Sequence, residues 1–215
     1  MSENKKNEQS AIEFLIAEYN EISQETRRLR QEGIVRLNFF IAITSSILAV
    51  LVFLSQSKAT TDAFFQISAI GVLSLLLLVG LNTFSFTIGR DISTDLNIRA
   101  TGRIRRFFSQ QNPEIQEYLT WRCHDEPTSW ITNNTSGLRR IVQYILSSIC
   151  ALITVLLLNL VGTNLGISTV VGVAILIISF ICFRGYAVRK FRQASISARK
   201  SVRFPEEDNP MAEGK

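Results

Sequence analysis

Three stretches of this chain contain no acidic residue, no basic residue and no histidine, and their lengths restrict the folds open to it. They are residues 37–57, 63–89 and 141–183. About 20 apolar residues in a helix cross the hydrocarbon core of a membrane, so each of the first two stretches has the length of one span. Uncharged helices of this length have no polar face to offer to water. The sequence therefore predicts membrane-spanning helices rather than a soluble bundle.

The third stretch is too long for a single span. As one helix, its 43 residues would measure roughly 65 Å, about twice the thickness of the hydrocarbon core. It contains VGTNLGIS at 161–168, where Gly162, Asn164 and Gly166 favour a turn and Thr163 and Ser168 can cap helix ends. We therefore expect a tight hairpin and four spans in total. The predicted fold is all-α, a four-span transmembrane helical bundle with cytoplasmic helical extensions.

The distribution of lysine and arginine predicts the orientation of these spans. If the spans alternate in direction, 22 of the 23 basic residues fall on one side, and Lys58 is the exception. Both termini and the central segment are then cytoplasmic. The net charge of +5 does not by itself indicate nucleic acid, because many arginines stand at span ends, where lipid headgroups attract them. The lipid bilayer is the expected partner.

These features divide the chain into five segments. Residues 1–36 form a cytoplasmic helix with a heptad-like pattern, and residues 37–89 form the first transmembrane hairpin. Residues 90–140 form a cytoplasmic helical segment and loop, residues 141–186 form the second hairpin, and residues 187–215 form a basic, partly disordered cytoplasmic tail.

The N-terminal segment carries a heptad seam. Ser10 and Glu13 have the spacing of a capping box, which predicts that a helix begins there and continues through Gly33 into the first span. Apolar residues then recur at spacings of 3 and 4, at Ile12, Leu15, Tyr19, Ile22 and Leu29, with Thr26 at the position between the last two. This seam indicates either a short coiled coil that sets a homo-oligomer, or a helix that packs on the protein's own central segment.

The central segment should continue the second span as a helix into the cytoplasm. A second helix is predicted from Asn112, with Pro113 at its first position. Arginines on this segment and beside the spans could contact a phosphate-bearing ligand, or lipid headgroups and the acids of the N-terminal helix. They are Arg99, Arg103, Arg106, Arg139 and Arg140.

The sequence contains no recognisable catalytic or metal centre. Cys123, His124, Asp125 and Glu126 are adjacent and so point in different directions, and no second cluster supplies further ligands. No glycine-rich phosphate loop or nucleophile elbow occurs. We therefore expect no catalytic residue, no metal and no cofactor, and a protein that is not an enzyme.

The spans do contain small polar residues, which can join helices by hydrogen bonds or line a pore. Concentration on one face of each span would favour a pore, and scatter would favour a non-conducting protein. Of the two asparagines we expect Asn82 to be more buried than Asn159, because strongly apolar residues surround it. The candidate pore or interhelical residues are Thr44, Ser45, Asn82, Ser85, Ser147 and Asn159.

The stretches GRIRRFF, NPEIQEYL and DEP, in residues 102–127, resemble a central cytoplasmic region of uncharacterised small bacterial multi-pass membrane proteins. Over roughly the first 90 residues, a charged N-terminal helix that feeds a two-span hairpin is similar in layout to the SLATT group. That resemblance implies a membrane effector in bacterial nucleotide-signalling conflict systems. Four spans depart from the two-span pattern of the group, so no functional residue is transferred.

Two functions remain open from the sequence. The first is an oligomeric channel-like or membrane effector module that responds to a cytoplasmic signal. The second is a non-conducting membrane anchor or scaffold for a cytoplasmic protein partner.

Overall fold

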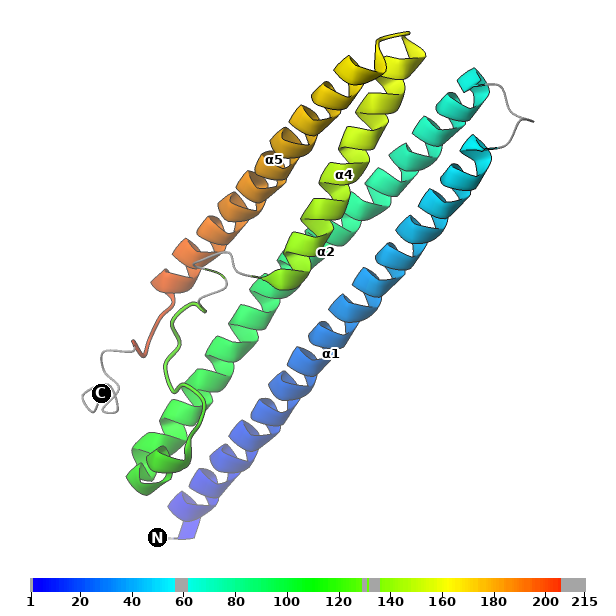
Figure 1. Ribbon diagram of the computed structural model, residues 1–215. Helices are drawn as coiled ribbons and strands as arrows, with labels where there is room; N and C mark the ends of the chain where they lie inside the picture. Colours follow the sequence, from blue (N-terminus) through cyan, green and yellow to red (C-terminus); the bar gives the residue numbers. More distant parts are fainter. Residues whose placement is uncertain (1, 57–61, 129–130, 132–135, 206–215) are drawn as a thin grey trace. The chain divides into compact units, whose positions relative to one another are not determined.

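The computed structural model describes residues 2–56, 62–128, 131 and 136–205, and for residues 2–8 and 116 it describes the backbone alone. Its regular secondary structure is entirely helical, with no strand among the described residues, which confirms the all-α prediction (Figure 1). Helix α1 spans Ser2–Ser55, α2 spans Asp62–Gln111, α4 spans Gly137–Leu160 and α5 spans Leu165–Lys200. A short 3₁₀ helix, η1, occupies Pro113–Tyr118.

Four helices, α1, α2, α4 and α5, are long and apolar enough to cross a membrane. These are the four that the charge-free stretches predict. The longest charge-free stretch is divided between α4 and α5, as expected from its length.

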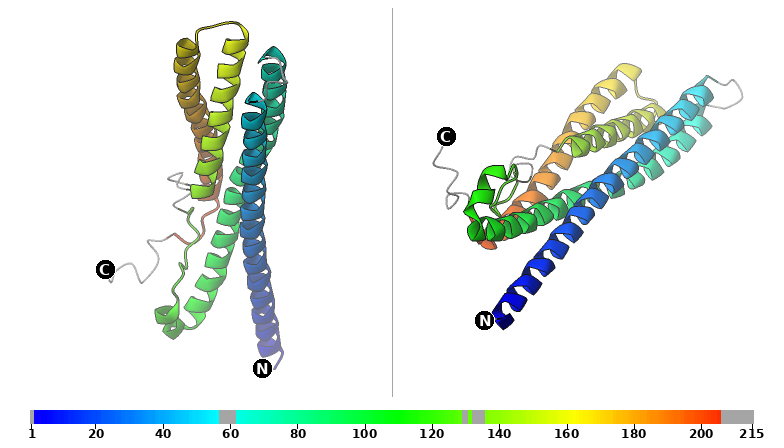
Figure 2. Two further views of the ribbon diagram at one scale, coloured as in Figure 1. Left: turned by 45° about the vertical axis from the view of Figure 1, so that its right-hand side comes forward. Right: turned by 90° about the horizontal axis from the view of Figure 1, so that it is seen from below.

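The chain forms two compact units. We call one the apolar unit, made of residues 33–89 and 136–190, and the other the charged unit, made of residues 1–32, 90–135 and 191–215. The apolar unit contains all the charge-free stretches. Helices α1, α2 and α5 each contribute residues to both units without a break (Figure 2).

The apolar unit has a closely packed interior. Phe40, Leu73 and Leu146, from three different helices, are each fully buried. Gly80 of α2 lies between two of them, because a Cβ atom there would stand 2.5 Å from Leu146 Cδ2 and 2.8 Å from Phe40 Cζ. Large apolar side chains such as Leu75, 66% exposed, cover the outside. An apolar exterior is what a helix needs where it faces lipid.

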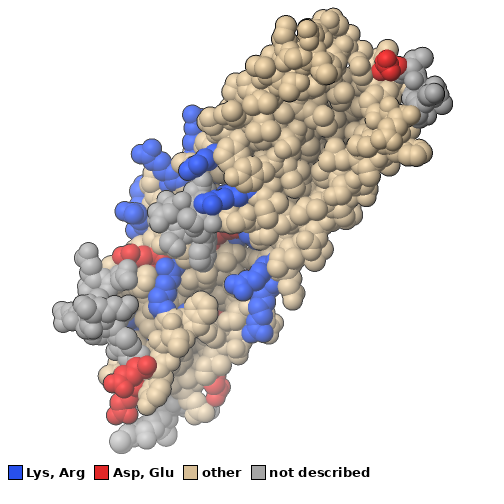
Figure 3. Space-filling model, viewed as in Figure 1, with Lys and Arg blue, Asp and Glu red and all other residues tan. Residues whose placement is uncertain are grey.

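The turn between α4 and α5 has the predicted chemistry. Gly162 adopts a φ of +83°, a conformation that favours glycine because it has no Cβ atom. The hydroxyls of Thr163 and Ser168 share a hydrogen bond of 2.7 Å, and the N–H of Gly166 donates to Oδ1 of Asn164 at 3.0 Å. On the face that Figure 3 shows, no Lys or Arg side chain lies on the surface of this turn.

Three predicted boundaries differ from the structure. Helix α1 begins at Ser2 rather than at Ser10, because the residues between them include no glycine or proline to stop it. The predicted second helix of the central segment is only the six-residue η1. The C-terminal tail is helical as far as Lys200, since no proline occurs in it before Pro205. Residues 206–215 of that tail lie outside the described residues.

Candidate functional site

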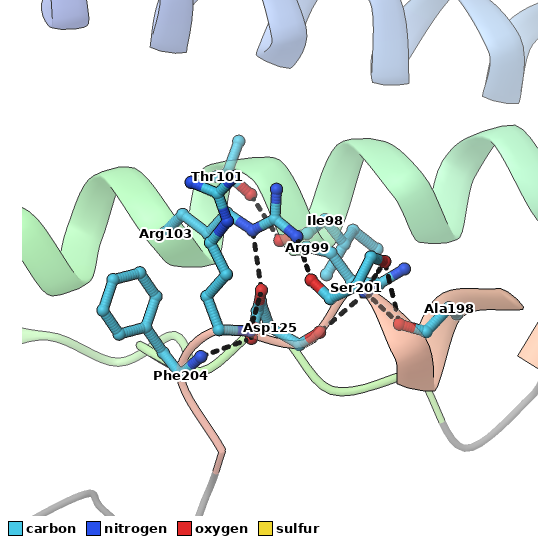
Figure 4. A network of polar contacts seen from close by, with 9 residues as sticks. Ile98, Arg99, Thr101, Arg103, Asp125, Ala198, Ser201 and Phe204 are labelled. Atoms are coloured by element: carbon cyan, nitrogen blue, oxygen red, sulfur yellow. Dashed lines mark hydrogen bonds and ion pairs between the residues drawn. The ribbon is translucent and has the colours of Figure 1, made fainter.

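Asp125 is the centre of a polar network in the charged unit. Its carboxylate has no exposed surface. Arg103 Nε donates to Oδ2 at 2.6 Å, and the backbone N–H groups of Arg203 and Phe204 donate to the same carboxylate at 3.1 and 2.9 Å (Figure 4). The N–H of Asp125 in turn donates to the carbonyl oxygen of Phe204 at 3.1 Å. One carboxylate thus joins α2 to the segment that follows α5.

Arg99, which is 2% exposed, reinforces this junction. Its Nε donates to the carbonyl oxygen of Asp125 at 2.7 Å, and its Nη2 donates to the carbonyl of Ala198 at 2.7 Å and to Ser201 Oγ at 3.0 Å. Arg103 Nη2 donates to the carbonyl of Ser201 at 2.7 Å. We refer to the side chains of Arg99, Arg103, Asp125 and Ser201, with the backbone of 198–204, as the Asp125 clamp.

The clamp determines the charge state of Asp125. Burial by itself raises the pKa of this carboxyl group, but the N–H of Phe204, the Arg103 guanidinium and the N–H of Arg203 together outweigh it. The pKa of Asp125 is therefore lowered. A carboxylate that accepts several hydrogen bonds from N–H groups is stabilised in its charged form. Asp125 is thus an anion bound by cationic and backbone donors.

A second buried carboxylate holds the other end of the same loop. Asp95 of α2, 3% exposed, accepts hydrogen bonds from both the N–H and the hydroxyl of Thr128, each at 2.7 Å. Between these two anchors Gly102 lies against the loop, because a Cβ atom there would clash with the carbonyl oxygen of His124. Residues 95, 99, 102 and 103 share one face of α2, so this face is the platform for the loop.

The buried Cys123 thiol has no feature of a reactive cysteine. Burial raises its pKa, and the positive charges of Arg105 and Arg106 offset only part of that rise. The thiol therefore stays protonated and resembles a structural cysteine. In the part of the chain that the structure describes, no three His, Cys, Asp or Glu side chains lie together as metal ligands would.

The arginines predicted to contact phosphate or lipid headgroups have different environments. The prediction is wrong for Arg99, which bonds within the clamp, and for Arg139, which is 1% exposed. Arg103 uses Nε and Nη2 in the clamp as well. Arg106 is half-buried and Arg140 is exposed. Sequence spacing put three of these arginines on one face of α2 but could not show that the loop and tail cover that face.

The predicted oligomer seam of α1 lies on one half-buried face. At Tyr19 this face contacts α2: Arg105 Nη2 donates to the Tyr19 hydroxyl at 2.9 Å, and the guanidinium lies 5.4 Å from the centre of the ring. This contact is expected if the seam packs on the protein's own central segment, which is one of its two interpretations. A coiled coil between copies stays a prediction.

The candidate polar residues of the spans do not share one face. Thr44 is buried and donates to the carbonyl of Phe40 at 2.7 Å, and Ser147 is fully buried. By contrast Ser45 and Ser85 are exposed.

The expected order of burial of the two span asparagines is wrong within one chain. Asn82 is exposed, and Asn159 is half-buried. The buried face of α2 runs through Leu76, Gly80 and Phe84, and a residue two positions from Gly80 points to the opposite side of the helix. The apolar neighbours of Asn82 therefore do not enclose it.

Comparison with known proteins finds no family model, no curated protein and no solved structure that matches this chain. The function is therefore inferred from the contacts within the two units.

Proposed function

We propose that this chain is a multi-pass integral membrane protein of a bacterial inner membrane, with the charged unit and both termini in the cytoplasm. Four helices of sufficient length and apolarity support the spanning part. The orientation is supported by the basic residues, which occur near the cytoplasmic ends of the proposed spans and are absent from the α4–α5 turn.

The orientation can be tested with reporter fusions. A reporter that is active only outside the cytoplasm should be active when it is fused after Gly162 and inactive when it is fused after Ser109. The reason is that the basic residues beside the spans keep residues 90–140 in the cytoplasm. A reporter active only in the cytoplasm should give the opposite pattern at the same two positions. If Ser109 instead reports outside and Gly162 inside, the proposed orientation is wrong.

We further propose that the protein is a membrane effector whose spans respond to the state of its charged unit. The observation that carries this proposal is the continuity of α1, α2 and α5, each of which runs from the charged unit into the apolar unit. The Asp125 clamp binds α2, the loop and the segment after α5 to one another. A signal that opens the clamp would free the cytoplasmic ends of two helices that also cross the membrane.

The exposed Asn82 supports an oligomeric form of this effector. An amide that faces hydrocarbon without a partner costs roughly 2 to 7 kcal/mol. In an assembly of copies, this face of α2 would instead meet another helix or a water-filled path. Ser85 lies on the same exposed side, so the polar surface is larger than one residue.

Opening the clamp by mutation tests the coupling. Asp125→Asn keeps the shape of the side chain but removes the charge that Arg103 and the backbone donors hold. In liposomes we expect this variant to change both ion flux and the reaction of Asn82→Cys with a water-borne thiol reagent, in a background without native cysteines. Glu114→Gln, a change at an exposed residue of η1, should alter neither.

A non-conducting scaffold is the second candidate, and one observation favours it. The span hydroxyls of Thr44, Thr87 and Thr154 donate to carbonyls of their own helices and are distributed over buried and half-buried positions, as in packed helices rather than in a pore. If Asp125→Asn opens the clamp, yet flux is absent and cysteine reactivity is unchanged, the effector proposal fails and the scaffold is the better account.

A further inference from the structure

The charged unit has an acidic groove between α1 and α2. The groove has a volume of about 630 Å³, and Glu18, Glu21, Glu25 and Asn97 are among the residues that line it. Arg28 pairs with Glu25 at 2.9 Å, whereas Glu18 and Glu21 form no ion pair with any residue that the structure describes. The Asn97 amide nitrogen is buried in this groove and has no hydrogen-bond partner among those residues. Arg28 also lines the groove and compensates Glu25, so the uncompensated negative charge is that of Glu18 and Glu21.

A basic stripe lies on the end of α5 in the same unit. Arg192, Ile196, Arg199 and Lys200 are all exposed. Ile196 lies four residues after Arg192, three before Arg199 and four before Lys200, so the four residues share one face of the helix. Ile196, 50% exposed, is an apolar side chain at the centre of this face. No carboxylate among the described residues pairs with these three cations.

The two surfaces lie at the same level along α2. Asn97 lines the acidic groove, and Arg99, two residues further on, donates to the carbonyl of Ala198 within the basic segment of α5. In Figure 1, α1 and the end of α5 lie on either side of α2 within the charged unit. The unit thus has a negative side and a positive side at matching heights.

We propose that the acidic groove receives the basic stripe of a second copy of this chain. Copies in one membrane share their orientation and depth, so the groove of one copy meets the stripe of its neighbour at the same height. The contact is head-to-tail: each copy uses one surface as donor and the other as acceptor, which builds a ring or an open row. This inference rests on the proposed function, because it needs the membrane orientation and gives the oligomer its interface.

Charge complementarity favours a second copy over a lipid headgroup. Anionic lipid could bind the arginines and lysine of the stripe, but Glu18 and Glu21 of the groove would repel it. An occupant with a basic surface complements Glu18 and Glu21, and the chain carries such a surface on the end of α5. A contact of this kind should weaken as salt screens it.

Cysteine crosslinking between two tagged copies tests the contact. In full-length protein without native cysteines, one copy carries Glu21→Cys and the other carries Arg199→Cys. Oxidation in the membrane should give a disulfide-linked pair with one copy of each tag. Glu114→Cys with Arg199→Cys is the matched control and should give only the background yield. Equal yields from both combinations would overturn the proposal.

Charge reversal separates this contact from lipid binding. Glu21→Lys with Glu25→Lys in both copies should reduce association to background, and Arg192→Glu with Arg199→Glu should do the same. A copy with reversed groove and a copy with reversed stripe should then associate through their two unreversed surfaces. If mixing these two variants does not restore association, or if only the stripe variant reduces association, a second copy is not the occupant of the groove. Trypsin resistance of the Asp125 clamp checks that each variant is folded.

The results also separate this inference from the effector proposal. If crosslinking fails while Asp125→Asn still alters flux, the interface is wrong and the effector stands. If crosslinking succeeds while flux never changes, the interface stands and the effector fails.

Discussion

Asp125→Ala is expected to release the segment after α5 from α2. The change leaves the Arg103 guanidinium and the N–H groups of Arg203 and Phe204 without their acceptor, in a place where Asp125 itself has no exposed surface. Removal of one partner from a buried ion pair costs about 3 to 5 kcal/mol. The side chain of Arg103 is 35% exposed and can regain some water, so we expect the lower part of this range.

Limited trypsin digestion measures this release directly. Arg199, Lys200 and Arg203 provide cleavage sites in or beside the clamp, and all three should be cut much faster in Asp125→Ala than in the wild type. Denaturant titration in detergent gives the accompanying loss in free energy of unfolding. Glu114→Ala is the control, since Glu114 lies exposed in η1. Equal digestion rates for the wild type and Asp125→Ala would show that the clamp does not hold the segment.

Because the pKa of Asp125 is lowered, the stability difference between the wild type and Asp125→Ala should depend on pH. A carboxyl group whose pKa is lower in the folded state than in the unfolded state stabilises the fold above its unfolded pKa. That contribution disappears as pH falls through the folded pKa, which lies below the usual aspartate value. The difference in thermal stability between the wild type and Asp125→Ala should therefore be full at neutral pH and shrink as the solution is acidified.

The spans could be predicted from sequence because their signal is local. The number of spans in a charge-free stretch follows from its length, whatever the stretch contacts. In the third stretch, Gly162 lies in the eight-residue segment 161–168 that contains the turn between the two spans. The Asp125 clamp could not be predicted in this way. Its partners lie 22 residues away on α2 and 78 and 79 residues away after α5, and no local spacing connects these positions. Asp125 stands beside a second acidic residue, Glu126, so no local pattern marks it as the buried carboxylate.

The exposure of Asn82 escaped prediction for a different reason. The second span is apolar on all sides, so its sequence has no hydrophobic periodicity that separates a core face from a lipid face. What distinguishes the faces is side-chain size, with Gly80 at the close contact between helices. A glycine in an apolar helix does not by itself indicate a close contact between helices. Gly71 and Gly89 lie in the same helix, and a Cβ atom at either would have nothing within 4 Å.

Gly80→Val should destabilise the apolar unit, whereas Gly71→Val in the same helix should not. The first carbon of a side chain at position 80 would stand 2.5 Å from Leu146 Cδ2 and 2.8 Å from Phe40 Cζ. Leu146 and Phe40 are fully buried, so neither can turn outward to make room. Overpacking of this kind costs about 1 to 3 kcal/mol. A Cβ atom at position 71 meets open space, and glycine in a helix already costs roughly 0.5 to 1 kcal/mol relative to alanine, so valine there should not lower stability.

A double-mutant comparison shows whether this cost arises at the predicted contact. Leu146→Ala removes the atom closest to the added carbon, so Gly80→Val should cost clearly less in that background than in the wild type. Unfolding in detergent, followed by circular dichroism, measures each difference, with Gly71→Val in both backgrounds as the control. Lipid tails solvate valine and leucine as well as the interior does, so association of these helices depends on close packing rather than on exclusion of water. If the cost of Gly80→Val were the same in both backgrounds, α2 and α4 would not meet at this glycine.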